Sequence, residues 1–215
     1  ALDLGHEPIW EVFHRFGIGQ PPGTGFPGES AGELPNRPRW YATEKVSLAF
    51  GYGITATPLQ LASAYAVFAN DGVQQRVSLL ALDGELPEGK RVIAPETAAK
   101  LMTMLHAVTN EDGTARKARV PGYQVGGKTG TVHKVGPGGY EKNKYVALFA
   151  GVAPIENPRI VTVVVINDPK GALYGGGAVA APVFAEMTTA AMRLLNVPPS
   201  ELSTVDTAVA KAAGG

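Results

Sequence analysis

The sequence predicts an α+β fold built around an antiparallel sheet. Two observations support this prediction. Three segments that begin with proline carry apolar residues at helical spacing, and between residues 128 and 166 several β-rich segments follow one another with short connections. Such connections allow antiparallel neighbours, whereas a parallel pair needs a crossover of about a dozen residues. With 215 residues, 45% of them hydrophobic, the chain can bury the core of one large domain or two small ones.

The helices are marked mainly by their first residues. We expect one helix from Pro8 to a stop at Gly17, one from Pro58 to a stop at Asn70-Asp71-Gly72, and one that begins at Pro95. Thr57 and Gln60 have the spacing of a capping box at the start of the second helix. Residues 17–38 are so rich in Gly and Pro that neither helix nor strand can persist, so a long packed loop is expected there.

The two ends of the chain differ from its middle. Ala1 to Leu4 are typical of the last turn of a helix with Gly5 as its left-handed stop, but no cap and no first turn precede them. We therefore expect the chain to begin inside a helix. Residues 198–215 are small and polar, which predicts a flexible C-terminal tail.

Composition excludes several classes of partner. Nineteen basic and nineteen acidic residues give no net charge, which argues against nucleic acid or an anionic membrane surface as partner. No apolar run reaches the roughly 18 residues of a membrane span, so no membrane contact by this segment is expected. Cysteine is absent, and no metal-ligand spacing links the four histidines, which are His6, His14, His106 and His133. We expect neither a metal site nor a cofactor.

One stretch matches two incompatible motifs. Residues 122–129, GYQVGGKT, fit the pattern of a phosphate-binding loop, whereas residues 126–131, GGKTGT, contain the Lys-Thr-Gly motif of serine acyl-transfer sites. A phosphate loop must lead into a helix, but the residues after Lys128 are β-rich and run into the turn 136–139. The run VTVVVIND, ending at Asp168, imitates a magnesium-binding strand, but its hairpin order contradicts a parallel sheet. A nucleotide-binding protein is therefore the remote alternative, and Lys128 is predicted to lie on a strand.

A strand with this motif has the groups that acyl transfer needs. Gly130, which has no Cβ, would let a peptide lie close to the strand edge as an added strand. Lys128 would supply a positive charge, and the hydroxyl of Thr129 could hold a carboxylate. The backbone N–H of Thr131 could stabilise an oxyanion. A lone Lys-Thr-Gly is a weak signal, however, and an ordinary strand with an exposed lysine is the competing interpretation.

Further motifs strengthen the acyl-transfer interpretation, because five segments occur in the order found in one family. They are GFPGE at 25–29, FGYGITATPLQLASAYAVFANDG at 50–72, GGKTGT at 126–131, LFAGVAP at 148–154 and GGGAVAAPVF at 175–184. Together they resemble the class B penicillin-binding proteins, the D,D-transpeptidases that cross-link peptidoglycan. The resemblance extends from residue 1 to about residue 197. GFPGE followed by GELP and AFGYG is more similar to the septal, cell-division branch than to the elongation branch.

The resemblance implies a fold and a set of site residues. It implies an antiparallel sheet covered by helices on both faces, of which residues 1–197 form the C-terminal part of the transpeptidase domain. The residues to which it assigns a role are Lys128, Thr129 and Gly130 as the third family motif, Thr131 in the oxyanion hole, Tyr52 near the mouth of the site, and Tyr145 and Tyr174 in the substrate pocket. Each tyrosine also has an ordinary core or surface interpretation. Gly175 stands where relatives often carry an aromatic residue.

Two family motifs are missing from the sequence. The nucleophile of the family lies in Ser-x-x-Lys and its proton relay in Ser-x-Asn, and neither pattern occurs here. The resemblance places both before the region matched by Ala1, so the chain alone is expected to be inactive. The intact protein would cross-link stem peptides, react with β-lactams, and work with the septal lipid II polymerase and other division proteins. It would lie at the periplasmic face of the inner membrane, anchored by an upstream helix.

Two further functions stay open. A serine β-lactamase would share the Lys-Thr-Gly strand but must also activate water, and the sequence shows no motif for the base. A non-catalytic penicillin-recognition module is the other alternative, because the nucleophile is not seen.

Overall fold

The computed structural model describes residues 3–37, 39–84 and 87–200. The chain forms two compact units, residues 1–98 and 99–215, and each is described by itself. The flexible tail expected from residue 198 falls, from residue 201 on, outside the described residues. The expected helical turn at the N-terminus also falls partly outside them; Gly5 has the expected left-handed conformation, with φ +75°.

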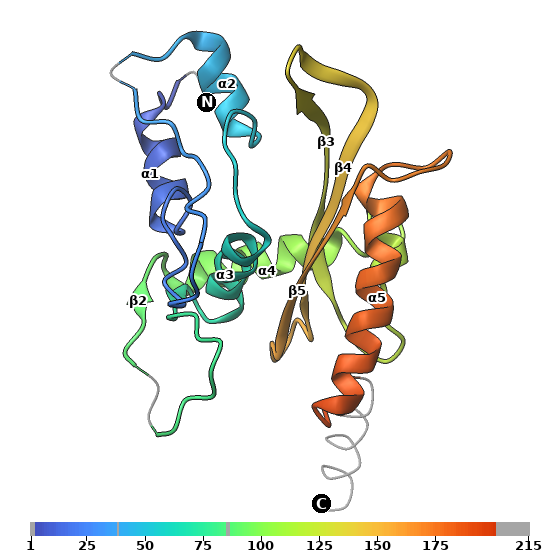
Figure 1. Cartoon of the computed structure of the whole chain (residues 1–215). Coiled ribbons are helices and arrows are strands. Elements are labelled where there is room, and N and C mark those ends of the chain that lie inside the picture. The colour runs from blue at the N-terminus through green and yellow to red at the C-terminus, as the bar shows by residue number, and fades with distance from the viewer. Residues whose placement is uncertain (1–2, 38, 85–86, 201–215) are drawn as a thin grey trace, which may run out of the picture. The chain divides into compact units, whose positions relative to one another are not determined.

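The first unit contains three helices and a short two-stranded ribbon. Its elements are α1 (Glu7–Arg15), α2 (Ala42–Ala49), α3 (Pro58–Ala69), β1 (Val73–Gln74) and β2 (Lys90–Arg91), with β1 and β2 antiparallel (Figure 1). The predicted helices at 8–17 and 58–72 are confirmed. Helix α2 was not predicted. Its eight residues carry no clear apolar stripe, its first turn has no proline, and its N-cap is Tyr41, which is not a typical capping residue.

The long loop of residues 17–37 contacts a buried glutamine of α3 and is also bridged to Thr55 by the backbone of Glu33. Gln60 is 3% exposed, and its Nε2 lies 2.8–3.1 Å from the carbonyl oxygens of Gly17, Gln20 and Ala31. Its Oε1 accepts a hydrogen bond from the N–H of Thr57, which completes the predicted capping box. The loop therefore packs against α3 through polar contacts, since its Gly- and Pro-rich sequence offers no regular hydrogen bonding of its own.

The second unit is an antiparallel sheet with helices. Helix α4 (Pro95–Ala107) leads into it from the first unit, followed by the 3-10 helix η1 (Arg116–Ala118), β3 (Gly126–Gly136), β4 (Gly139–Ala153), β5 (Ile160–Asn167) and α5 (Gly176–Leu194). The strand order β3-β4-β5 confirms the predicted meander. Strand β4 starts six residues earlier than Tyr145 because β3 and β4 continue to pair up to the hairpin turn at Pro137 and Gly138.

Helices contact both faces of this sheet, as expected. Helix α5 lies along one face, where the rings of Phe149 and Phe184 are fully buried with centroids 4.8 Å apart (Figure 1). Successive strand residues point to opposite faces. Gly127 faces Phe149, and the neighbouring Gly126 faces the last turn of α4, where a Cβ would lie 2.7 Å from the backbone nitrogen of His106.

The segment that leads into β3 is tied to the end of the chain that follows α5. The hydroxyl of Tyr123 donates to the carbonyl of Val197 at 2.6 Å. The N–H of Ser200 donates to the carbonyl of Gly122 at 2.7 Å, and Ser200 is 8% exposed. Because β3 begins three residues after Tyr123, these contacts fix where the strand starts.

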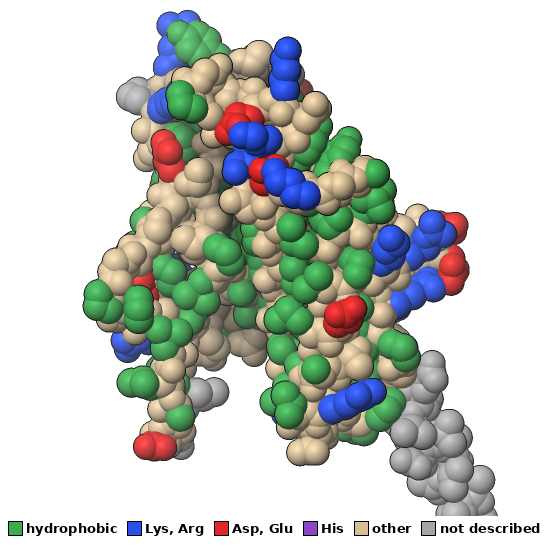
Figure 2. All heavy atoms as spheres, turned by 45° about the vertical axis from the view of Figure 1, so that its right-hand side comes forward, with side chains coloured by type: hydrophobic (Ala, Val, Ile, Leu, Met, Phe, Trp, Pro, Cys, Tyr) green, Lys and Arg blue, Asp and Glu red, His purple; other side chains and the backbone are tan. Residues whose placement is uncertain are grey.

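Charged side chains lie in mixed groups on the surface. Figure 2 shows, on the face turned towards the viewer, Lys and Arg side chains next to Asp and Glu side chains rather than one broad patch of a single sign. The described ion pairs include Arg37 with Glu44 and Lys170 with Asp168. This distribution agrees with a net charge of zero.

Replacing Gln60 with leucine should destabilise the first unit. The substitution leaves the carbonyls of Gly17, Gln20 and Ala31 without their donor in a part-buried site, and we expect a loss of about 2–4 kcal/mol. Urea unfolding followed by tryptophan fluorescence reports on this unit, because both tryptophans of the chain, Trp10 and Trp40, lie in it. Gln75→Leu, an exposed glutamine, is the control. Equal unfolding midpoints for the two variants would contradict the role given to Gln60.

Candidate active site

Lys128 lies on the edge strand of the described sheet. Strand β3 pairs only with β4 among the described strands, and Lys128 is its third residue. The side chain is exposed, and its Nζ lies 3.0 Å from the carbonyl oxygen of Thr129 and 3.5 Å from the Thr129 hydroxyl. The predicted strand position is confirmed. A phosphate-loop lysine lies at the start of a helix, so the structure excludes the nucleotide-binding alternative.

The start of α5 is pinned to β3 by Thr131. The hydroxyl of Thr131 accepts a hydrogen bond from the N–H of Gly176 at 3.0 Å. This N–H belongs to the first residue of α5 and would have no partner within the helix. A Cβ on Gly176 would lie 2.3 Å from the carbonyl oxygen of Leu148 and 2.6 Å from that of Gly130. The helix can start this close to the sheet only because residue 176 is glycine.

At the two other glycines of the predicted site, Gly130 and Gly175, an added Cβ would meet side-chain atoms instead of backbone carbonyl oxygens. A Cβ on Gly130 would lie 2.8 Å from Cγ of Leu148, so the missing side chain makes room for Leu148 inside the sheet layer. This is a packing reason in addition to the substrate contact expected from the sequence. A Cβ on Gly175 would meet only the Thr131 hydroxyl oxygen, at 4.0 Å, and Gly175 has φ −74°. The fold therefore does not require glycine at 175.

A cavity of about 550 Å³ opens beside the two threonines of the motif. Thr129 and Thr131 line it from β3, and residues 175–178 line it from the start of α5. The remaining lining residues precede or belong to η1: Gly113, Thr114, Arg116 and Lys117. The cavity thus brings together three segments that are far apart in the sequence. Of these residues, Thr129 and Thr131 were predicted from the sequence, whereas those that precede β3 were not.

An aromatic group lies further along β3 and β4. The rings of Tyr145 and Tyr174 are stacked, with centroids 4.0 Å apart and planes at 13°. His133, which is paired with Tyr145 across the strands, has its ring 4.6 Å from the Tyr145 ring. Burial raises the pKa of Tyr145, and the neighbouring Tyr174 raises it further. The structure therefore brings together the two tyrosines predicted on this unit.

His133 was not predicted to join this group. It lies two residues beyond Thr131 on β3, so its side chain points to the same face as that of Thr131. This strand alternation is the signal in the sequence that could have identified it.

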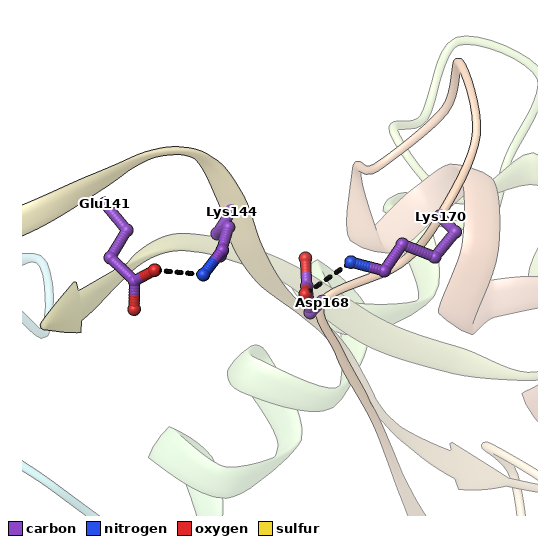
Figure 3. Close-up of polar contacts among 4 residues, drawn as sticks. All are labelled: Glu141, Lys144, Asp168 and Lys170. Atoms are coloured by element: carbon purple, nitrogen blue, oxygen red, sulfur yellow. Dashed lines mark hydrogen bonds and ion pairs between the residues drawn. The ribbon is translucent and has the colours of Figure 1, made fainter.

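Two ion pairs lie on β4 and just after β5, near Tyr145 in the sequence or in its strand pairing (Figure 3). Lys170 donates to the Asp168 carboxylate at 2.6 Å, and Lys144 pairs with Glu141. The N–H of Asp168 donates to the carbonyl of Tyr145 at 2.8 Å. The hydrogen bond from Lys170 is the main cause of a lowered pKa of the Asp168 carboxyl, to which the charges of other lysines add. These contacts anchor the start of the loop that carries Tyr174.

Tyr52 belongs to the first unit, whereas the other predicted site residues belong to the second. Its ring lies 5.4 Å from that of Phe50 in an edge-on arrangement. The role at the mouth of the site stays a prediction for this residue.

Residues 3–200, apart from the undescribed positions 38, 85 and 86, carry neither a metal-binding cluster nor a membrane-spanning helix. No group of three His, Cys, Asp or Glu residues in this part of the chain is arranged to hold a metal ion. None of the helices described there combines the length and the hydropathy that crossing a bilayer requires.

Known proteins resemble the chain in both sequence and structure. Residues 1–189 match the family described as the penicillin binding protein transpeptidase domain. The peptidoglycan D,D-transpeptidase FtsI of Escherichia coli is 40% identical over 206 residues, which cover 96% of this chain and 35% of FtsI. The probable D,D-transpeptidase PbpC of Pseudomonas aeruginosa is 39% identical over 202 residues, covering 94% of this chain and 36% of PbpC.

A solved structure agrees with these matches. The apo transpeptidase domain of penicillin-binding protein 3 from Burkholderia pseudomallei superposes with a TM-score of 0.84 and 42% identity, over 90% of this chain and 59% of that domain. The chain therefore belongs to the penicillin-binding protein transpeptidase family. Its similarity to FtsI and penicillin-binding protein 3 places it in the class B transpeptidase domain, and it spans about a third of the length of the curated relatives.

The two glycines at the start of α5 should respond differently to alanine. Gly176→Ala places a Cβ within 2.3 Å of the Leu148 carbonyl, so the helix must move away from β3, at a cost of about 1–3 kcal/mol. Gly175→Ala meets only ordinary contacts and should leave the free energy of unfolding within about 0.5 kcal/mol of the parent. Chemical denaturation followed by circular dichroism measures both. Equal losses for the two variants would refute the close packing at Gly176.

The Asp168 carboxyl should titrate at higher pH when Lys170 is replaced by glutamine. Lys170 stabilises the charged carboxylate, which lowers the pKa of Asp168. The pair therefore contributes stability above the pKa that Asp168 has in the unfolded chain, and this contribution is lost as the pH falls through the lower folded value. Carbon-detected NMR titration of the carboxyl between about pH 2 and 6 measures the change. Lys142→Gln is the control, and an unchanged Asp168 titration in Lys170→Gln would contradict the assignment.

Proposed function

We propose that the chain is the C-terminal part of a cell-division peptidoglycan D,D-transpeptidase that cross-links stem peptides through a serine acyl-enzyme and is acylated by β-lactams. One observation carries the proposal: the GGKTGT segment lies on an exposed sheet edge, beside a cavity lined by its two threonines. Family membership and the names of the relatives, several of which are D,D-transpeptidases, support the reaction type.

Each group of the motif then has a role. Lys128 provides a positive charge next to the reacting serine, and the Thr129 hydroxyl holds the carboxylate of the peptide or of the β-lactam. Gly130 lets the ligand backbone lie along the edge of β3 as an added strand. The N–H of Thr131 stabilises the oxyanion; loss of one such donor typically costs about a hundred- to a thousand-fold in rate.

The tyrosines act as walls for the substrate. Tyr145 and Tyr174, stacked at 4.0 Å, form a flat surface against which an apolar part of the ligand packs. For Tyr52, the resemblance to the family is the basis of the proposed role near the mouth of the site. Gly175 leaves one side of this surface open, since no side chain extends from it next to Thr131.

The reaction itself needs a group that this chain does not carry. The serine oxygen bonds to the carbonyl carbon of the donor peptide, the terminal amino acid leaves with a proton on its nitrogen, and an acceptor amine then takes the acyl group and releases the serine. Neither Ser-x-x-Lys nor Ser-x-Asn occurs in residues 1–215, so the nucleophile and its proton relay lie on a segment upstream of this chain. The chain by itself is inactive.

The intact protein then works at the cell envelope. By similarity to FtsI, it acts during cell division at the periplasmic face of the inner membrane, anchored by an upstream helix. Its partners are the septal lipid II polymerase and other division proteins.

Labelling with a fluorescent penicillin tests the proposal. The 215-residue chain should not be labelled, whereas the protein that includes the upstream residues should be. In that longer protein, Lys128→Ala should slow acylation at least about a hundred-fold because it removes the charge beside the nucleophile. The free energy of unfolding should change by less than about 0.5 kcal/mol, because Lys128 is exposed.

The controls separate the competing functions. Lys142→Ala, at an exposed position of β4, should be labelled at the normal rate. Labelling of the 215-residue chain alone, or normal labelling of Lys128→Ala, would refute the transpeptidase assignment. Rapid turnover of nitrocefin by the longer protein would instead indicate a β-lactamase, and the absence of any labelled serine would indicate a non-catalytic recognition module.

A further inference from the structure

The cavity beside Thr129 and Thr131 has charged side chains of one sign. Arg116 and Lys117 contribute the only charged side chains to its described lining, and no described carboxylate lines it. The other lining residues are threonines, glycines and one alanine, which leave the backbone and the hydroxyls accessible. A cavity of this kind favours a ligand with a negative charge.

The packing of η1 against the core fixes the backbone that carries Arg116 and Lys117. Ala115 and Ala118, which flank them in the sequence, are fully buried against the core of the second unit. The N–H of Ala115 donates to the carbonyl of Val108 at 3.0 Å, and the N–H of Ala118 donates to the carbonyl of Ala115 at 2.9 Å. With both alanines fixed, the short helix η1 turns Arg116 and Lys117 outwards, where both are exposed.

Neighbouring acidic residues leave these cations available. Glu111 is the carboxylate that interacts with this segment, and it forms its ion pair with Arg119. Arg119 also donates through Nε to the carbonyl of Thr109, so its position is fixed. The pKa of Glu111 is lowered mainly by Arg119, and Arg116 adds a smaller contribution. Within the described part of the chain, neither Arg116 nor Lys117 forms an ion pair of its own.

The two threonines of the motif line the same cavity and carry hydroxyl groups that could bind the same anion. Thr129 and Thr131 line the cavity from β3, and the Thr131 hydroxyl already accepts the N–H of Gly176. Its own hydrogen therefore remains as a donor. Hydroxyl donors and cations in one cavity are suited to binding a carboxylate, whose oxygens accept several hydrogen bonds.

We propose that Arg116 and Lys117 form an anion-binding subsite with Thr129 and Thr131, which attracts and holds the carboxylate of the peptide or β-lactam ligand. The part of this inference that concerns the ligand rests on the proposed function. The anion-binding part rests on the cavity and its lining residues. Within this subsite, Arg116 and Lys117 act on association: they raise the rate at which anionic ligands reach β3, without touching the reacting carbonyl.

The anion-binding part is tested on the 215-residue chain with sulfate as the probe. In NMR spectra, sulfate should produce saturable shifts of the amide signals of the glycines that line the cavity, Gly113 and Gly177. Sodium chloride at the same ionic strength should not produce these shifts. In the double variant Arg116→Gln/Lys117→Gln the saturable shifts should disappear. Shifts that persist in this variant, or that are absent from the parent chain, would overturn the proposal.

The ligand part is tested by acylation of the longer protein with benzylpenicillin. The double variant should lower the second-order rate constant about ten-fold at low salt, and sulfate should no longer slow the reaction more than chloride does at equal ionic strength. The control Arg159→Gln/Arg193→Gln removes the same charge at exposed positions outside the cavity and should leave both readouts unchanged. Equal slowing by both double variants, or none by the first, contradicts the subsite.

The two tests also separate this inference from the proposed function. Sulfate shifts in the parent chain together with a longer protein that no penicillin acylates would leave the anion site standing and refute the transpeptidase assignment. Normal acylation with no dependence on Arg116 and Lys117 would leave the transpeptidase assignment standing and refute the ligand part of this inference.

Discussion

The hydrogen bond from the N–H of Gly176 to the hydroxyl of Thr131 is the contact on which the candidate site depends. It joins the first residue of α5 to β3 at the point where the Lys-Thr-Gly motif ends. The close approach at Gly176 keeps the helix against the sheet, with Phe184 packed on Phe149 further along. Because α5 and β3 are fixed to each other here, the cavity between them has a defined wall on each side.

The groups around this contact come from separate parts of the chain. Thr129 lies on β3, Tyr145 on β4, Tyr174 on the loop before α5, and Arg116 on η1. A ligand in the cavity would meet hydroxyl groups and two cations, which together suit an anion such as a carboxylate. The second unit thus brings the motif of the transpeptidase family next to cationic and hydroxyl side chains from other segments.

Some features of the fold and the site were predictable because their causes are local. The capping box of Thr57 and Gln60 involves residues three apart, and the strand position of Lys128 follows from the β-rich residues and tight turn after it. Helix α5 was missed because its opening glycines and Pro182 are poor helix formers; packing on the sheet compensates for them.

The antiparallel meander, three of the helix starts and, through the ordered motifs, the family could be predicted from the sequence alone. Three features became visible only in the folded chain: the stacking of Tyr174 on Tyr145, the need for glycine at 176 but not at 175, and the position of Arg116 and Lys117 in the lining of the same cavity as Thr129 and Thr131. The physical reason is the range of the interactions. Caps, turns and strand alternation act over a few residues, whereas these contacts join segments 10 to 60 residues apart, which approach each other only when α5 packs on the sheet.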